Sequence, residues 1–163
     1  MINHITGDII KLAENGNFDY ILHGCNCFHT MGSGLAGQLV KKYPIILAAD
    51  KTTAYGDREK LGKWTNAKIS TYHNQFTIVN VYTQFFFGLG TDVFEYDSFD
   101  EFLNSFGEHL KMRGSRVRVA FPKISAGLAG GNWPRILQSI SNFSKLNSDF
   151  IDVTIVSYVN DQV

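Results

Sequence analysis

Two glycine-rich segments constrain the fold of this chain more than any other feature. HGCNCFHTMGSGLAG, from His23 to Gly37, combines the end of an apolar strand, a turn of small and polar residues and the start of a helix. FPKISAGLAGG, from Phe121 to Gly131, repeats this arrangement later in the chain. Glycines let a backbone approach a ligand closely, and free backbone N–H groups at a strand-to-helix turn attract phosphate. The two segments therefore predict strands that lead directly into helices, and a ligand that carries a diphosphate.

Apolar runs of strand length alternate with segments of helical periodicity. The predicted strands, about six in number, are Asn3–Thr6, Tyr20–Cys25, Ala67–Thr71, Phe76–Thr83, Arg116–Phe121 and Asp152–Val159. The predicted helices are Ile9–Glu14, Leu35–Ala54, Phe99–Met112 and Trp133–Leu146. This alternation predicts an α/β fold with a mixed, mostly parallel sheet that is covered by helices on both faces. In such folds, ligands bind outside the carboxyl ends of the strands.

Local signals define the starts of the two longer helices in the second half of the chain. Ser98 and Glu101 have the spacing of a capping box. Asn132 is placed to cap the last helix, and Pro134 would lie in its first turn, where the missing N–H costs little.

Length and composition limit the classes of function. The 163 residues suit a single domain over residues 1–163. The 15 basic and 15 acidic side chains create no field that favours duplex DNA. Because no apolar segment approaches the length of a membrane span and the N-terminus lacks a signal-peptide pattern, we expect a soluble, cytoplasmic protein with no membrane partner. We also expect a monomer that uses no cofactor. Cys25 and Cys27 are too close in sequence for a relaxed disulfide, so we expect free thiols.

Individual residues in these segments have both a structural and a functional interpretation. Asp8 is either the N-cap of the first helix or a carboxylate that accepts from the amino group of a bound ring. Asn26 is either a turn residue or a donor and acceptor for sugar hydroxyls. Tyr158, near the end of the last strand, either packs in the core or stacks on a base.

The alternating residues His23, Cys25, Cys27 and His29 invite comparison with a metal site or a thiolate nucleophile. Neighbouring ligands on one strand would be about 6.6 Å apart, which is too far for one tetrahedral ion. We therefore expect no metal here, with Cys25 in the core and His29 exposed on the turn. The histidines remain candidates for a general acid or base.

Taken together in this order, GDI at Gly7–Ile9, HGCNCFHTMGSGLAGQL and FPKISAGLAGGNW resemble the macrodomain family over nearly the whole chain. The HGCNC form is most similar to the ADP-ribose 1''-phosphate phosphatase branch and its phage-encoded relatives. This resemblance implies a three-layer α/β/α sandwich. It also implies ADP-ribose or ADP-ribose 1''-phosphate as the ligand, with ADP-ribosylated macromolecules as further partners, in the cytoplasm of a bacterium or of a virus-infected host cell.

The resemblance also assigns roles to residues. Asp8 and Ile9 would bind adenine, with Tyr158 stacking on it. Asn26 would contact the distal ribose, and Gly32–Ala36 would wrap that ribose and its phosphate. The predicted catalytic residues are Asn26, His23 and His29. The predicted ligand-binding residues are Asp8, Ile9, Asn26, Gly32, Ser33, Gly34, Leu35, Ala36, Ser125, Ala126, Gly127, Leu128, Ala129, Gly130 and Tyr158.

Departures from the family pattern limit the catalytic mechanisms that this chain could use. In the glycohydrolase branch that removes terminal ADP-ribose, a lysine and an aspartate occupy the positions of Gln84 and Ala129 here, which disfavours a lysyl covalent mechanism. The leading hypothesis is therefore hydrolysis of ADP-ribose 1''-phosphate by a positioned water. The alternatives are a non-catalytic reader of ADP-ribose and a hydrolase that removes ADP-ribose from protein or nucleic acid.

Overall fold

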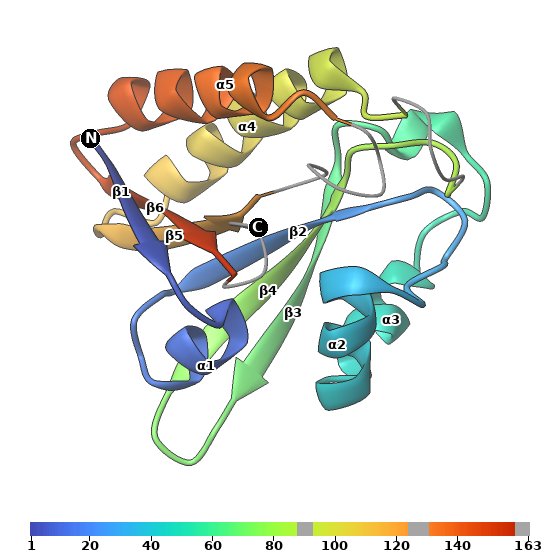
Figure 1. Ribbon diagram of the computed structural model, residues 1–163, viewed down its shortest axis with the longest axis horizontal. Helices are drawn as coiled ribbons and strands as arrows, with labels where there is room; N and C mark the ends of the chain where they lie inside the picture. The colour runs from blue at the N-terminus through green and yellow to red at the C-terminus, as the bar shows by residue number, and fades with distance from the viewer. Residues whose placement is uncertain (88–92, 124–130, 159–163) are drawn as a thin grey trace.

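A computed structural model of the chain describes residues 1–87, 93–123 and 131–158 (Figure 1). The predicted diphosphate-binding residues Ser125–Gly130 lie outside these ranges.

The centre of the structure is a six-stranded mixed sheet. Its strands are β1 (Ile2–Thr6), β2 (Tyr20–Cys25), β3 (Trp64–Ser70), β4 (Gln75–Tyr82), β5 (Val117–Pro122) and β6 (Ile151–Ser157). Their order across the sheet is β1-β6-β5-β2-β4-β3, and every neighbouring pair is parallel except β4 and β3. The predicted α/β class with a mixed, mostly parallel sheet is confirmed.

Helices cover both faces of this sheet (Figure 1). Helices α1 (Ile9–Glu14), α2 (Gly34–Lys42) and α3 (Ile45–Asp50) lie on one face, and α4 (Tyr96–Lys111) and α5 (Trp133–Leu146) lie on the other. Each face has its own apolar core. On β2, Ile21 packs toward α1, α2 and α3, whereas the next residue, Leu22, packs toward α4 and α5. Both faces of the strand are buried because side chains alternate across a sheet, which explains its continuous apolar run.

Two predictions about helices were wrong. The predicted helix Leu35–Ala54 is two helices, since Pro44 between them cannot donate the backbone hydrogen bond that a continuous helix needs. The predicted capping box is also absent, because α4 begins earlier, at Tyr96, and Ser98 and Glu101 lie inside it. By contrast, α5 has the predicted bounds, and the Asn132 side chain accepts from the backbone N–H of Arg135. The sequence reading also missed a short 3-10 helix, η1 (Arg58–Lys60).

Candidate functional site

The candidate site lies along one edge of the sheet. Since β1, β6, β5, β2 and β4 run parallel, their carboxyl ends meet at that edge. The residues that follow β1, β2 and β6 include Asp8, Asn26 and Tyr158, three of the predicted ligand-binding residues. The topology therefore brings together segments that are far apart in the sequence.

Asp8 and Tyr158 come from opposite ends of the chain and meet at this edge. The backbone N–H of Gly7 donates to the carbonyl oxygen of Ser157 at 2.9 Å, which continues the β1–β6 pairing beyond the strands. Asp8 and Tyr158 each follow one of these bonded residues, and Tyr158 is 45% exposed. The predicted partners for an adenine ring are thus neighbours, with an aromatic face accessible to solvent.

Asp8 caps helix α1, as its structural interpretation predicts. Its Oδ1 accepts from the backbone N–H groups of Ile10 at 2.9 Å and Lys11 at 3.2 Å. Both of these bonds use one carboxylate oxygen, so Oδ2 can still accept from a ligand amino group. Ile9 is buried in the core, and its N–H, in the first turn of the helix, has no acceptor within that helix. Asp8 also lines a depression of about 420 Å³ between α1 and α2, together with Ile10, Lys11, Gln38, Lys41 and Lys42.

Asn26 holds the first glycine-rich turn together. Its Nδ2 donates to the carbonyl oxygen of Thr30 at 2.9 Å, and its Oδ1 accepts from the backbone N–H of Phe28 at 2.8 Å. The amide retains a second N–H hydrogen and a second lone pair that could meet a ligand. Asn26 is 8% exposed, so only a group seated directly in the turn could reach it.

The glycines of this turn have different roles. A Cβ on Gly37 would lie 3.2 Å from the backbone carbonyl carbon and oxygen of Gly32, a tight contact that the turn could accept only if its backbone shifted. Gly34 has φ +59°, a left-handed conformation that favours glycine. Among the described residues, none has an atom within 4 Å of a Cβ built on Gly32. The described part of the chain therefore does not require glycine at position 32 for its packing, and it leaves the space beside this residue open.

The remaining residues of this segment lead into helix α2. Ser33 is its N-cap residue but its side chain makes no capping hydrogen bond, and it is exposed. Leu35 and Ala36 are half-buried in the first turn of the helix. The backbone N–H groups in the first turn of a helix have no acceptor within that helix, and they attract an anion.

His23 is enclosed in a polar network beneath the site. It is 2% exposed, and its Nε2 lies 2.5 Å from Oδ1 of Asn80. The Asn80 Nδ2 donates to the carbonyl oxygen of Ile46 and to Oγ1 of Thr65, so its Oδ1 is the acceptor and His23 Nε2 carries the proton. Burial lowers the pKa of His23 to about 4, against weaker opposing effects of the Asn80 hydrogen bond and the Asp50 charge. The ring is neutral at physiological pH and is closed to a ligand.

A carboxylate belongs to the same buried region. Asp50 is 1% exposed, and its Oδ1 accepts from the hydroxyl of Tyr82 at 2.7 Å. Among the described residues, its Oδ2 has no hydrogen-bond partner. The buried Lys60 ammonium lies 4.7 Å from the centre of the Tyr82 ring and donates to the carbonyl oxygen of Cys27. Sequence reasoning missed this network, although Asn80 and Tyr82 are polar residues at alternating positions of an apolar strand.

His29 lies on the turn, as predicted, but it is half-buried rather than exposed. Its Nε2 is 3.0 Å from the carbonyl oxygen of Thr53, so Nε2 carries the proton and Nδ1 can accept. Both cysteines are free thiols, as predicted, and both are buried. Burial raises the pKa of Cys25 well above its ordinary value and also raises that of Cys27, which disfavours a thiolate nucleophile. No group of three or more metal-ligating side chains occurs within residues 1–87, 93–123 and 131–158.

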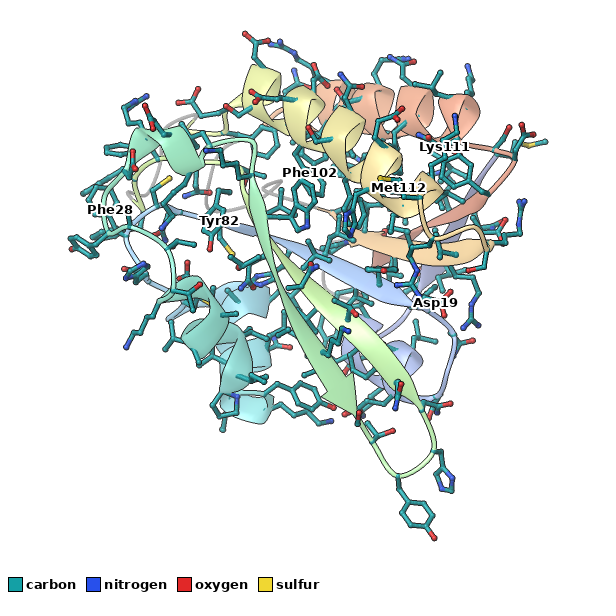
Figure 2. The ribbon with its side chains drawn as sticks, turned by 180° about the vertical axis from the view of Figure 1, so that it is seen from behind. Asp19, Phe28, Tyr82, Phe102, Lys111 and Met112 are labelled. Atoms are coloured by element: carbon teal, nitrogen blue, oxygen red, sulfur yellow. The ribbon has the colours of Figure 1, made fainter. Side chains whose placement is uncertain are left out.

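An aromatic cluster surrounds the turn that Asn26 holds. It consists of Phe28, Tyr55, Phe85, Phe86 and Phe87. The sequence shows the run Phe85–Phe87, but only the fold brings Phe28 and Tyr55 to it. Phe28 follows β2, near the carboxyl ends of the parallel strands, whereas Asp19 precedes β2 at their amino ends. The two residues are therefore far apart (Figure 2).

Comparison with solved structures defines the class of fold. The macrodomain of Mycobacterium tuberculosis DarG superimposes with a TM-score of 0.77 and 18% identity, covering 96% of this chain and 97% of that chain. A Trypanosoma brucei macrodomain in complex with ADP-ribose matches with a TM-score of 0.64 and 16% identity, covering 96% of this chain and 63% of that chain. The chain thus has the macrodomain fold, with its candidate site at the carboxyl ends of the strands.

A relative of known sequence identifies the family. The uncharacterized 17.5 kDa protein in the tk-vs intergenic region of Enterobacteria phage T4 is 40% identical over 158 residues, which cover 93% of this chain and 96% of that protein. The chain belongs to the family of this phage protein. No family model matches the chain. None of the helices in the described ranges is long and apolar enough to cross a membrane.

Proposed function

We propose that this protein binds ADP-ribose at the carboxyl edge of its sheet and hydrolyses ADP-ribose 1''-phosphate to ADP-ribose and phosphate. The observation that carries the proposal is the convergence of Asp8 and Tyr158 with the turn of Asn26 and Gly32 along one edge. The Trypanosoma brucei macrodomain of the same fold is known in complex with ADP-ribose, which supports this class of ligand.

The proposed pose runs along the edge from β1 and β6 toward β2. The adenine ring lies between Tyr158 and Asp8, whose Oδ2 accepts from the adenine amino group while Oδ1 caps α1. The diphosphate lies against the start of α2. The residues predicted from the sequence to bind it, Ser125–Gly130, are outside the described ranges. The distal ribose faces Asn26 and fills the open space beside Gly32.

The proposed reaction transfers the terminal phosphoryl group to water. The water oxygen forms a bond to phosphorus while the bond between phosphorus and the ribose oxygen breaks, and the proton lost by water ends on the ribose hydroxyl. Backbone N–H groups of the turn that leads into α2 stabilise the charge on the phosphate oxygens. His29, whose Nε2 is held by Thr53, is the candidate that carries the proton through Nδ1, whereas the enclosed His23 does not meet the substrate.

Phosphate release from ADP-ribose 1''-phosphate, together with calorimetric binding of ADP-ribose, tests this proposal. The diagnostic variant is Gly32→Ala, because its methyl group meets no atom of the described residues but enters the space given to the distal ribose. We expect ADP-ribose affinity and turnover to fall by about tenfold or more, which corresponds to about 1.4 kcal/mol, while thermal unfolding is unchanged. Ser148→Ala, an exposed change before β6 at the opposite edge, serves as the control.

The other outcomes separate the remaining candidate functions. Binding of ADP-ribose without turnover of any substrate would make the protein a reader. Release of ADP-ribose from modified protein or DNA, with no action on the 1''-phosphate, would make it a hydrolase of macromolecular conjugates. If ADP-ribose does not bind at all, the proposed site is wrong.

A further inference from the structure

At one point along the carboxyl edge of the sheet, the connections of two neighbouring strands leave on opposite faces. After β2 the chain continues to β3 through α2 and α3 on one face, whereas after β5 it continues to β6 through α5 on the other (Figure 1). The pairing of β2 with β5 covers only residues 20–21 and 119–120, so the two strands are unpaired toward their carboxyl ends. Ligands of open α/β sheets bind at such a switch point. The residues that directly follow β2 and β5 therefore flank the place where a ligand crosses this edge.

Lys123 directly follows β5, on one side of this switch point. The register of β5 with β6 pairs Pro122 with Val156. Lys123 is therefore level with Ser157, the residue before Tyr158. Neighbouring strands are about 4.8 Å apart, and β5 lies between β6 and β2 in the sheet. Lys123 thus lies between the residues proposed to face adenine and the turn proposed to face the distal ribose, where the diphosphate of the ligand would be.

The charge of Lys123 is complementary to a diphosphate. Lys123 is the one basic residue among the described residues at the first two positions after the parallel strands β1, β6, β5, β2 and β4. Asp8 belongs to the same set, and its carboxylate repels an anion placed beside it. A diphosphate is a dianion, to which backbone N–H groups present only partial positive charges. A full positive charge at the switch point would therefore stabilise the bound diphosphate.

The surroundings of the Lys123 ammonium group leave it able to meet a ligand. Within the described ranges, no carboxylate forms an ion pair with it. The residue is half-buried, and Nζ lies 6.0 Å from the centre of the Trp133 ring, at the outer limit of a cation–π contact. Two cations near the turn after β2 are engaged instead, since Lys60 donates to a backbone carbonyl of that turn and Arg58 is paired with Glu95.

We propose that Lys123 binds the diphosphate of the ligand through its ammonium group and is a specificity-determining residue of the site. This inference rests on the proposed function, because the ligand is the ADP-ribose that occupies the carboxyl edge. The diphosphate then lies between Lys123, which follows β5, and the start of α2, which follows the turn after β2. A lysine ammonium is a compact charge with three donors, which suits phosphate oxygens. Binding through a full charge also makes the affinity depend on salt.

Calorimetric titration of ADP-ribose into the full chain at several salt concentrations tests the inference. Lys123→Met removes the charge but keeps an unbranched apolar stem against Trp133, so we expect ADP-ribose affinity to fall on the order of tenfold. Lys123→Arg keeps the charge and should recover most of this affinity. Added salt should weaken binding to the wild type more steeply than binding to Lys123→Met. The matched control is Lys145→Met, which removes an exposed lysine in the last turn of α5 and should leave the affinity unchanged.

The other outcomes overturn the inference in ways that can be told apart. If Lys123→Met binds ADP-ribose with wild-type affinity, the role of Lys123 is wrong and the proposed function stands. If the methionine and arginine variants are weakened equally and the salt dependence is that of the wild type, the side chain acts through packing on Trp133 and not through its charge. If the wild type does not bind ADP-ribose, both proposals fall. Thermal unfolding checks each variant, and Lys123→Gln replaces the methionine variant if that protein does not fold.

Discussion

Replacing His23 by glutamine is expected to change how the stability of this protein depends on pH. His23 is 2% exposed and donates through Nε2 to Asn80. Burial lowers its pKa from 6.5 to about 4. As the pH falls from 6.5 to about 4, the unfolded chain binds a proton at His23 whereas the native protein does not. The free energy of unfolding therefore falls from its value above pH 6.5 as the pH approaches 4.

The size of the effect follows from the same two pKa values. A tenfold difference in proton affinity corresponds to about 1.4 kcal/mol, so the change from 6.5 to about 4 corresponds to about 3 kcal/mol. That is a large fraction of the stability of a typical domain. Asp152 acts at lower pH, because hydrogen bonds from Arg116 lower the pKa of its carboxyl group.

Denaturant unfolding at a series of pH values between 4 and 7 measures the effect. The glutamine side chain keeps an amide donor for Asn80 but does not titrate. His23→Gln should therefore lose most of the pH dependence in this window, whatever its absolute stability. The matched control is His73→Gln, which changes an exposed histidine in the turn between β3 and β4. A wild-type slope in His23→Gln, or a flat profile in the wild type, would refute the assignment of His23 as a buried neutral ring.

Three further predictions concern the site and its support. Asn26→Asp replaces the amide group that donates to the Thr30 carbonyl by a carboxylate oxygen, which cannot donate. We therefore expect the free energy of unfolding to fall by about 1–3 kcal/mol and ADP-ribose binding to weaken. If neither quantity changes, the role given to the amide is contradicted. Gly37→Ala should lower the melting temperature, because its methyl group crowds the turn backbone, and an unaltered melting curve would count against this close approach. Tyr82→Phe removes the hydroxyl that donates to Asp50 and should cost about 1–3 kcal/mol in denaturant unfolding; equal stability would mean that water or another donor serves the carboxylate.

The order of elements and the edge of the sheet at which the candidate site lies could be predicted from local patterns. The bounds of β2, α1 and α5 follow from apolar runs and from caps such as Asn132, which act within a few residues. Where a competing local rule was overlooked, prediction failed. Pro44 divides the segment Leu35–Ala54, because its missing N–H outweighs the apolar periodicity that continues beyond it.

The candidate catalytic histidines show where local patterns are insufficient. His23 and His29 lie in the same motif, yet one is enclosed and the other lies on the turn. Which of them meets a ligand depends on Asn80 and Thr53, which come from other elements of the fold. A sequence pattern contains the residue types but not the burial that sets their pKa values.

By itself, the sequence determined the α/β class, the positions of the two glycine-rich segments and the resemblance to macrodomains, since backbone geometry and apolar periodicity are local properties. Only the tertiary structure brought Asp8 beside Tyr158, gathered Phe28 and Tyr55 with the run Phe85–Phe87, and buried His23. Those outcomes depend on strand order and on packing between distant segments. The physical reason is that exposure, hydrogen-bond partners and proton affinity are set by neighbours in space, which the chain acquires only when the sheet is assembled.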